Sequence, residues 1–374
     1  MKIIRTMLIG TLSLLLGCIA LVWIVMQLAP SFGGDLTSNQ KSLFEQLANF
    51  NQGKFRNRQD VPKQPGFKKT LELAFKFFTT RVINGRPSQN LPLVTHTKEA
   101  LFTFDKTRLI WLGHSTFLLQ HLGKNILIDP MFGPVPAPFT WLGDKRFSKT
   151  LPFTIADLPP IDAVLISHDH YDHLDFKSIQ ELHPKVKYFF VPLGVENHLL
   201  RWGVPQEKIS TLNWWEKTNS AGFEFVCTPA QHFSGRKMSN SQETLWASWV
   251  IKADNLSLYF SGDSGYDSHF KKIGEKYGPF DLALLECGQY NPMWADIHMF
   301  PEETAQAGID LNAKKIMPIH WGAFKLAMHA WDEPVQRVVK AANEKQIAIE
   351  VPVIGASIFL DAVAKPLDFW WIID

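Results

Sequence analysis

The sequence predicts an α/β fold, and two observations carry that prediction. Short apolar runs rich in β-branched and aromatic residues recur between residues 107 and 354, and most end at a turn-forming or polar residue. Such runs are typical of buried strands. Segments of helical length separate them, and strands that alternate with helices indicate an α/β architecture.

The chain begins with a long apolar segment. Residues 7–29 carry no charge and follow Lys2 and Arg5. At about 1.5 Å per residue, a helix of this length spans a hydrocarbon core of about 30 Å. We interpret residues 1–6 as a cytoplasmic stub and residues 7–29 as an uncleaved transmembrane anchor, with the remainder on the extracytoplasmic (periplasmic) side. Cleavage of the segment and lipidation at Cys18 remain alternatives, although the apolar run continues past Cys18.

Residues 30–105 are predicted to form a linker with N-terminal helices. The Gly33-Gly34 pair and a proline-containing polar run indicate loops, and helices are expected at 40–48 and 67–80. The second of these is amphipathic, with phenylalanines and lysines. It is expected to pack on the following domain, with a position on the membrane surface as the alternative.

Residues 106–374 are predicted to form one globular domain. Strands are expected at 108–113, 115–120, 125–130, 161–166, 188–191, 223–228, 243–251, 256–262, 282–287, 315–319 and 349–354. Helices are expected at 176–182, from about 194, and at 268–277, 302–311 and 334–345. The segment 131–150, rich in proline, glycine and aromatic residues, is expected to be a loop.

The strand predicted at 161–166 ends in a cluster of metal-capable side chains: His168, His170, Asp172 and His173. In an extended segment His168 and His170 point the same way and can reach one ion together. Asp172 and His173 follow where the chain turns towards a helix, and they can face a second ion. So many desolvated imidazoles are costly without a cation, which favours a metal site over a polar surface cluster.

Three later residues have the same placement at the end of an apolar strand: His232, Asp263 and His320. Each alone would fit a structural role, but together with the cluster at 168–173 they fit a metal site. No G-x-S-x-G elbow occurs, so nothing indicates a serine nucleophile.

The string SHDHYDHLD contains HxHxDH, and GDSGY and IHWG lie downstream. Over roughly residues 107–360 the sequence resembles the metallo-β-lactamase superfamily, and within it the branch of N-acyl-phosphatidylethanolamine-hydrolysing phospholipase D. The resemblance implies an αββα sandwich that holds two zinc ions, with iron or manganese acceptable at the second site. It assigns one ion to His168, His170 and His232, the other to Asp172, His173 and His320, and a bridging role to Asp263.

The same resemblance implies further roles. Asp172 would act in catalysis as well as in metal binding, and Asp129 would hydrogen-bond a ligand histidine and orient it. His298 would orient a phosphate oxygen or protonate the leaving group. His114 matches a family position with a supporting role. Met293 stands where the branch often carries an arginine, and it lies in a loop expected to line the substrate groove together with residues 132–141.

The resemblance implies a dinuclear zinc phosphodiesterase that hydrolyses a membrane phospholipid by attack of a metal-activated hydroxide on phosphorus. A hydrolase of lactones or β-lactams with the same metals is the alternative, and a non-catalytic metal-dependent scaffold is an alternative of another class. The net charge of +2 gives no reason to expect nucleic acid as a partner. A homodimer is one option for the oligomeric state.

Three cysteines, Cys18, Cys227 and Cys287, do not form a disulfide framework. Cys227 and Cys287 lie in apolar runs, where buried free thiols are expected. A disulfide between them is the alternative for a domain outside the cytoplasm.

Overall fold

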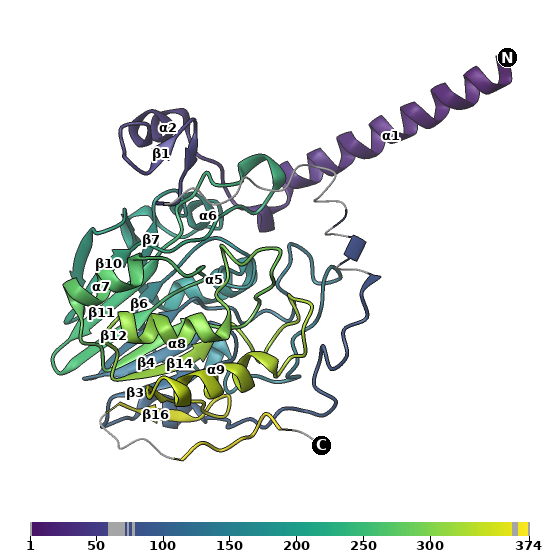
Figure 1. The fold of residues 1–374 in the computed structure, drawn as a ribbon. Helices are drawn as coiled ribbons and strands as arrows, with labels where there is room; N and C mark the ends of the chain where they lie inside the picture. The colour runs from purple at the N-terminus through teal and green to yellow at the C-terminus, as the bar shows by residue number, and fades with distance from the viewer. Residues whose placement is uncertain (1, 59–71, 73–74, 77–78, 361–365, 373–374) are drawn as a thin grey trace.

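The computed structural model describes residues 2–58, 72, 75–76, 79–360 and 366–372. Two seven-stranded sheets form the body of the molecule, with helices on their outer faces (Figure 1). The first sheet has the order β16-β3-β4-β5-β6-β7-β8. Its strands are β3 (Arg108–Trp111), β4 (Phe117–His121), β5 (Lys124–Ile128), β6 (Ile161–Leu165), β7 (Val186–Pro192), β8 (Ile209–Leu212) and β16 (Ser357–Phe359).

The second sheet has the order β15-β14-β13-β12-β11-β10-β9. Its strands are β9 (Lys217–Ser220), β10 (Phe223–Thr228), β11 (Ser248–Ala253), β12 (Leu256–Phe260), β13 (Leu282–Glu286), β14 (Lys315–Ile319) and β15 (Ala348–Ile349). The principal helices are α1 (Lys2–Leu28), α2 (Ser38–Phe44), α4 (Lys98–Phe102), α5 (Phe176–Leu182), α6 (Glu196–Arg201), α7 (His269–Tyr277), α8 (Pro301–Asp310) and α9 (Glu333–Glu344). A two-stranded hairpin, β1 (Phe50–Asn51) and β2 (Lys54–Phe55), precedes the sheets.

The inner strands are apolar on both faces because each sheet packs against the other sheet on one face and against helices on the opposite face. In β5, Ile126 and Ile128 join the core between the sheets, whereas Leu127 joins the core beneath the outer helices. The sheets contact each other directly, as the rings of Phe117 and Phe260 show with centroids 6.4 Å apart. This two-sheet sandwich with helices outside confirms the predicted αββα fold.

The strand directions place the candidate site residues at one edge of the sheets. Strands β5, β6 and β7 are parallel, and so are β12, β13 and β14. The carboxyl ends of parallel neighbours meet at the same edge, so the polar residues that follow them gather there. Helix α5 then turns the chain away from that edge. It has the predicted bounds, and its start is fixed by the Asp175 carboxylate, which accepts the Ser178 N–H at 2.9 Å.

Several predicted elements differ from the structure. The strand expected at 349–354 is reduced to Ala348–Ile349, because Pro352 has no N–H to donate to a sheet ladder. The helix expected at 40–48 is the shorter α2, which begins at a capping box of Thr37 and Gln40. The helix expected at 67–80 lies mostly outside the described residues. Strands β8 and β9 were not predicted.

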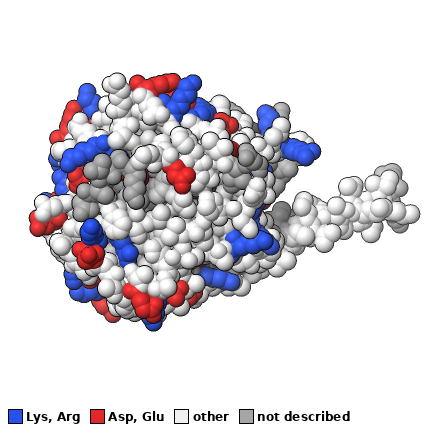
Figure 2. Space-filling model, turned by 90° about the horizontal axis from the view of Figure 1, so that it is seen from below, with Lys and Arg blue, Asp and Glu red and all other residues white. Residues whose placement is uncertain are grey.

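Helix α1 projects from the body, and Figure 2 shows it without charged side chains where it leaves the domain. Within the described residues it is the helix that is long and apolar enough to cross a membrane, a property that signal sequences share. Its carboxyl end is held to the domain. The Arg201 guanidinium donates to the carbonyls of Gln27 and Gly33 at 2.6 Å, and the Trp202 indole donates to that of Pro30 at 2.7 Å.

The cysteines follow the prediction of free thiols. Cys227 and Cys287 are buried and unpaired as disulfides, and Cys18 is exposed on α1. Burial raises the pKa of both Cys227 and Cys287, so neither thiol is activated as a nucleophile.

Candidate metal centre

Three imidazoles converge at the end of β6. His170 Nδ1 lies 2.9 Å from His168 Nε2 and 3.2 Å from His232 Nε2. His232 Nδ1 faces the carbonyl of Ile297 at 3.0 Å and therefore carries the proton. Its Nε2 then has a free lone pair. Burial lowers the pKa of all three histidines, so neutral imidazoles face one another at contact distance. A cation between them would satisfy these nitrogens.

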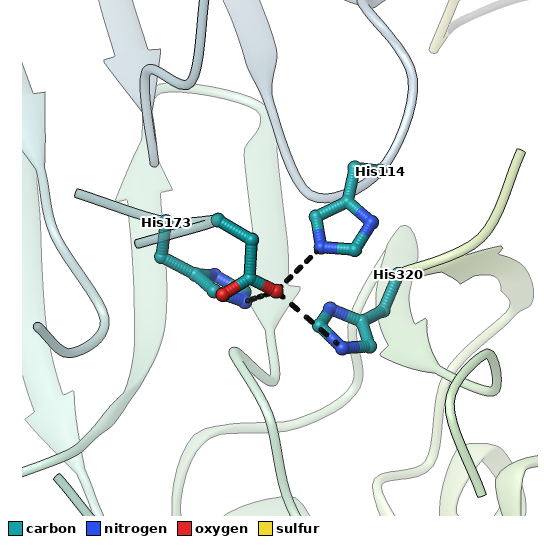
Figure 3. Close-up of side chains that lie close together, drawn as sticks. His114, His173 and His320 are labelled. Carbon is teal, nitrogen blue, oxygen red and sulfur yellow. Dashed lines mark hydrogen bonds and ion pairs between the residues drawn. The ribbon is translucent and has the colours of Figure 1, made fainter. Parts of the chain in front are cut away.

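A second group consists of His114, Asp172, His173 and His320, and Figure 3 shows its three histidines around a carboxylate. The Asp172 Oδ2 oxygen lies 2.7 Å from His114 Nε2, 3.4 Å from His173 Nε2 and 3.8 Å from His320 Nε2. Burial alone would raise the pKa of Asp172, but His173 and His114 hold it well below its usual range. His114 was expected to have a supporting role, and its hydrogen bond to Asp172 fits that role.

Asp263 lies between the two groups. Its Oδ2 faces the first group, at 3.7 Å from both His168 Nε2 and His232 Nε2. Its Oδ1 faces the second, at 3.1 Å from His173 Nε2 and 3.0 Å from His320 Nδ1. One carboxylate that turns one oxygen to each group has the geometry of a bridging ligand.

The donor set fits a pair of metal ions. His173 Nε2 and Asp263 Oδ1 are buried and have no hydrogen-bond partner of acceptable geometry, although they lie 3.1 Å apart. Buried polar atoms without partners are rare because each costs about 1–3 kcal/mol. The two groups offer the nitrogen and carboxylate ligands that zinc and similar transition metals take.

Asp129 supports the second group from behind. Its Oδ2 accepts the His173 Nδ1–H at 2.7 Å, while the Ser167 N–H and hydroxyl donate to its two oxygens at 2.7 and 2.6 Å. With Nδ1 hydrogen-bonded to Asp129, His173 turns Nε2 towards the site, where Nε2 lies 3.1 Å from Asp263 Oδ1. The resemblance implied a hydrogen bond from Asp129 to a ligand histidine, and in the structure that histidine is His173.

His298 lies beside both ligand groups. Its ring centroid is 5.0 Å from that of His232 and 5.5 Å from that of His320, on which it stacks. Its Nδ1 contacts the carboxylate of Glu286, which is fully buried at the end of β13. Burial, with Asp263 nearby, raises the pKa of Glu286 well above its usual range.

Sequence reasoning missed Glu286, because LALLE reads as one apolar strand with a terminal polar residue. The available signal was its position. Glu286 ends the strand between the two that deliver Asp263 and His320.

Known proteins share this fold and parts of this sequence. A family model described as a beta-lactamase superfamily domain matches residues 124–321. An uncharacterised protein of Mycobacterium tuberculosis is 38% identical over 370 residues, which cover 97% of each chain. The Caenorhabditis elegans N-acyl-phosphatidylethanolamine-hydrolyzing phospholipase D 1 is 36% identical over 244 residues, 62% of this chain and 66% of that protein.

Among solved structures, a metallo hydrolase from the archaeon Ignicoccus hospitalis superposes with a TM-score of 0.53 at 23% identity. It covers 68% of this chain and 98% of its own, and the likeness is one of fold. Fold, site and relatives together define a metal-dependent hydrolase. More narrowly, the chain belongs to the metallo-β-lactamase superfamily.

Proposed function

We propose that this protein is a dinuclear zinc phosphodiesterase that hydrolyses a membrane phospholipid of the N-acyl-phosphatidylethanolamine type. The products would be phosphatidic acid and an N-acylethanolamine. The observation that carries the proposal is the pair of adjoining ligand groups with Asp263 between them, since two closely spaced metals suit displacement at phosphorus. The partial likeness to the phospholipase D of C. elegans supports the substrate class.

The two groups of side chains support the proposed ligand sets. His168, His170 and His232 would hold one ion, Asp172, His173 and His320 the other, and Asp263 both. Bound zinc would supply a hydroxide near neutral pH and positive charge against the phosphoryl oxygens.

Two residues that are not in the ligand sets would orient a metal ligand and protonate the leaving group. Asp129 keeps Nε2 of His173 directed into the site, as its 2.7 Å hydrogen bond requires. His298 lies beside both ligand groups and would give a proton to the departing alkoxide oxygen. Without that proton an alkoxide is a poor leaving group, so its transfer is worth about 10²–10⁴-fold in rate.

An aromatic groove supports a lipid substrate. A cavity of about 350 Å³ is lined by Ser31, which follows α1, by the segment 132–141, and by Tyr171 of the metal loop. Phe139 stacks on Trp141, which is 78% exposed, and also contacts Phe32. Apolar surface that joins the metal loop to a candidate membrane helix suits acyl chains.

Membrane attachment belongs to the same proposal. We propose that α1 anchors the protein, with the domain on the periplasmic side, where the substrate groove faces the bilayer from which α1 emerges. The hydrogen bonds from Arg201 and Trp202 to the end of α1 would fix how the domain sits above the lipid.

The test is direct. Detergent-solubilised, zinc-loaded full-length protein is incubated with a panel of phospholipids in ¹⁸O-labelled water, and the products are identified by mass spectrometry. Attack on phosphorus places the label in phosphatidic acid, whereas cleavage on the carbon side places it in the ethanolamine product. The variant His168→Ala should be inactive, and His183→Ala, at the end of α5, should match the wild type.

Two outcomes would end the proposal. Opening of simple lactones or β-lactams with every phospholipid untouched would leave only the metal-dependent hydrolase. Release of free fatty acid in place of phosphatidic acid would show a carboxylic esterase.

A further inference from the structure

The second sheet delivers three polar residues side by side. Its parallel strands β12, β13 and β14 run in the same direction, and Asp263, Glu286 and His320 lie at or just after their carboxyl ends. The outer two belong to the ligand groups described above. Glu286, at the centre, is fully buried and belongs to neither.

Both oxygens of the Glu286 carboxylate are used. Oε2 accepts the backbone N–H of Ser264, the residue after Asp263, at 2.6 Å, and Oε1 is hydrogen-bonded to His298 Nδ1. The backbone of Glu286 is fixed as well. Its N–H donates to the Ser261 hydroxyl at 2.9 Å, and its carbonyl accepts from the Thr304 hydroxyl at 2.7 Å. The carboxylate therefore has one position, and it sets the orientation of the imidazole above it.

That contact decides which ring nitrogen of His298 can face the substrate. Because Nδ1 is occupied by the hydrogen bond to Glu286, Nε2 is the nitrogen left for the site. One ring nitrogen of His298 lies within 4.8 Å of ligand atoms of both Asp263 and His320. The side chain of His298 is 13% exposed, so it lies beside the ligand groups and still meets solvent.

We propose that Glu286 is a positioning residue that holds His298 with Nε2 aimed at the leaving oxygen of the substrate. The inference rests on the proposed phosphodiesterase function. In that reaction the oxygen of water bonds to phosphorus, the ester P–O bond breaks, and its electron pair stays on the alkoxide oxygen. This oxygen takes the Nε2 proton of the His298–Glu286 pair, in which a second proton is shared between Nδ1 and Oε1. A proton released by the attacking water then returns to Nε2.

The conservative variant is Glu286→Gln. Glutamine keeps the volume but has one acceptor oxygen, so its NH₂ must face either the Ser264 N–H or the His298 Nδ1–H. One donor then loses its partner, and the imidazole is free to turn or change tautomer.

The experiment compares two phosphodiesters on the zinc-loaded full-length protein. One has an alkyl leaving group, as in an N-acyl-phosphatidylethanolamine. The other releases p-nitrophenolate, which needs no proton to depart. We expect Glu286→Gln to lower kcat on the alkyl ester by about 10²-fold with little change in KM, and to lower kcat on the p-nitrophenyl ester less than about threefold.

Three further measurements separate positioning from a merely structural role. Bound zinc, measured by mass spectrometry, should match the wild type. A long-range ¹H–¹⁵N spectrum should show a change in the His298 imidazole signals, assigned by their loss in His298→Ala. The double variant should be no slower than His298→Ala alone, because both changes remove one function.

Glu350→Gln is the matched control, because Glu350 pairs with Lys315 at the opposite end of β14 and should change nothing. Equal losses on both esters, or a loss of zinc, would show that Glu286 only supports the metal site. Full activity would show that it has no role. If the wild type cleaves no phosphodiester, the proposed function fails, but the role of Glu286 can still be tested. The same comparison is then made with the alkyl and p-nitrophenyl versions of the ester that the enzyme does hydrolyse.

Discussion

Replacing Asp129 by asparagine tests how far the metal centre depends on residues that do not bind the metal. Asp129 is fully buried, and its carboxylate accepts three hydrogen bonds, from His173 Nδ1, the Ser167 N–H and the Ser167 hydroxyl. Asparagine keeps the shape but loses the charge and one acceptor oxygen. Its NH₂ must then oppose at least one of these donors.

The expected magnitude follows from the contact to His173. The lost bond joins an imidazole to a buried carboxylate at 2.7 Å, and hydrogen bonds to charged groups contribute about 1.5–3 kcal/mol. Loss of such a partner behind a ligand histidine lowers metal affinity about 10–100-fold. At about 1.4 kcal/mol per factor of ten, the two figures agree. We expect the zinc dissociation constant of Asp129→Asn to rise within this range, with activity falling as zinc is lost.

The measurement is a zinc titration of metal-stripped full-length protein against a competing chelator, with far-UV circular dichroism to show that the variant is folded. Asp162→Asn makes the same chemical change at the amino end of β6, where Asp162 accepts the Asn125 N–H at 3.1 Å. This control should bind zinc like the wild type. A folded Asp129→Asn protein that binds zinc within twofold of the wild type would refute the argument.

Four other outcomes can be checked. His168→Ala should lose activity and bind less zinc, measured by elemental analysis, whereas two zinc ions and full turnover would refute the ligand assignment. Trp141→Ser should weaken apparent lipid affinity by about tenfold or more, since the apolar burial lost is worth about 1.5–3 kcal/mol, while Leu122→Ser, at the hairpin away from the metals, should not. Trp371 is 1% exposed and contacts the Trp321 ring, so Trp371→Ala should lower the free energy of unfolding, measured in urea, by about 3–5 kcal/mol. A decrease of less than about 1 kcal/mol would contradict its position in the core. A reporter fused after the last residue should report a periplasmic location, and a cytoplasmic signal would overturn the proposed topology.

The fold could be predicted because the inner strands carry their own signal. Strands such as β6 and β14 are apolar on both faces and stop at a polar residue, so both their course and their ends are visible in the sequence. The structure brings the polar residues at those ends together, from both sheets, in two adjoining groups.

The edge strands and the buried Glu286 could not be predicted from such a local pattern. Strands β8 and β9 lie at the edges of their sheets, and β9, with the sequence KTNS, is polar because water covers it. Glu286 was hidden for the opposite reason, since it is a charged residue inside a buried strand and only the pairing of β13 with its neighbours places it beside the site. Pairing between distant strands is not readable from a local pattern.

The metal loop and the end of α1 are joined by one buried side chain. The Arg236 guanidinium donates to the carbonyls of Asp169 and Leu174, on either side of the ligands His170 to His173, at 2.6 and 2.8 Å. The same group donates to the carbonyl of Ser31 from Nε at 3.0 Å and from Nη2 at 2.8 Å. A buried guanidinium that loses an acceptor is costly, because the remaining N–H groups cannot reach water. The residues that follow α1 are therefore part of the support of the metal loop, and a soluble form that keeps the site intact has to begin before Ser31.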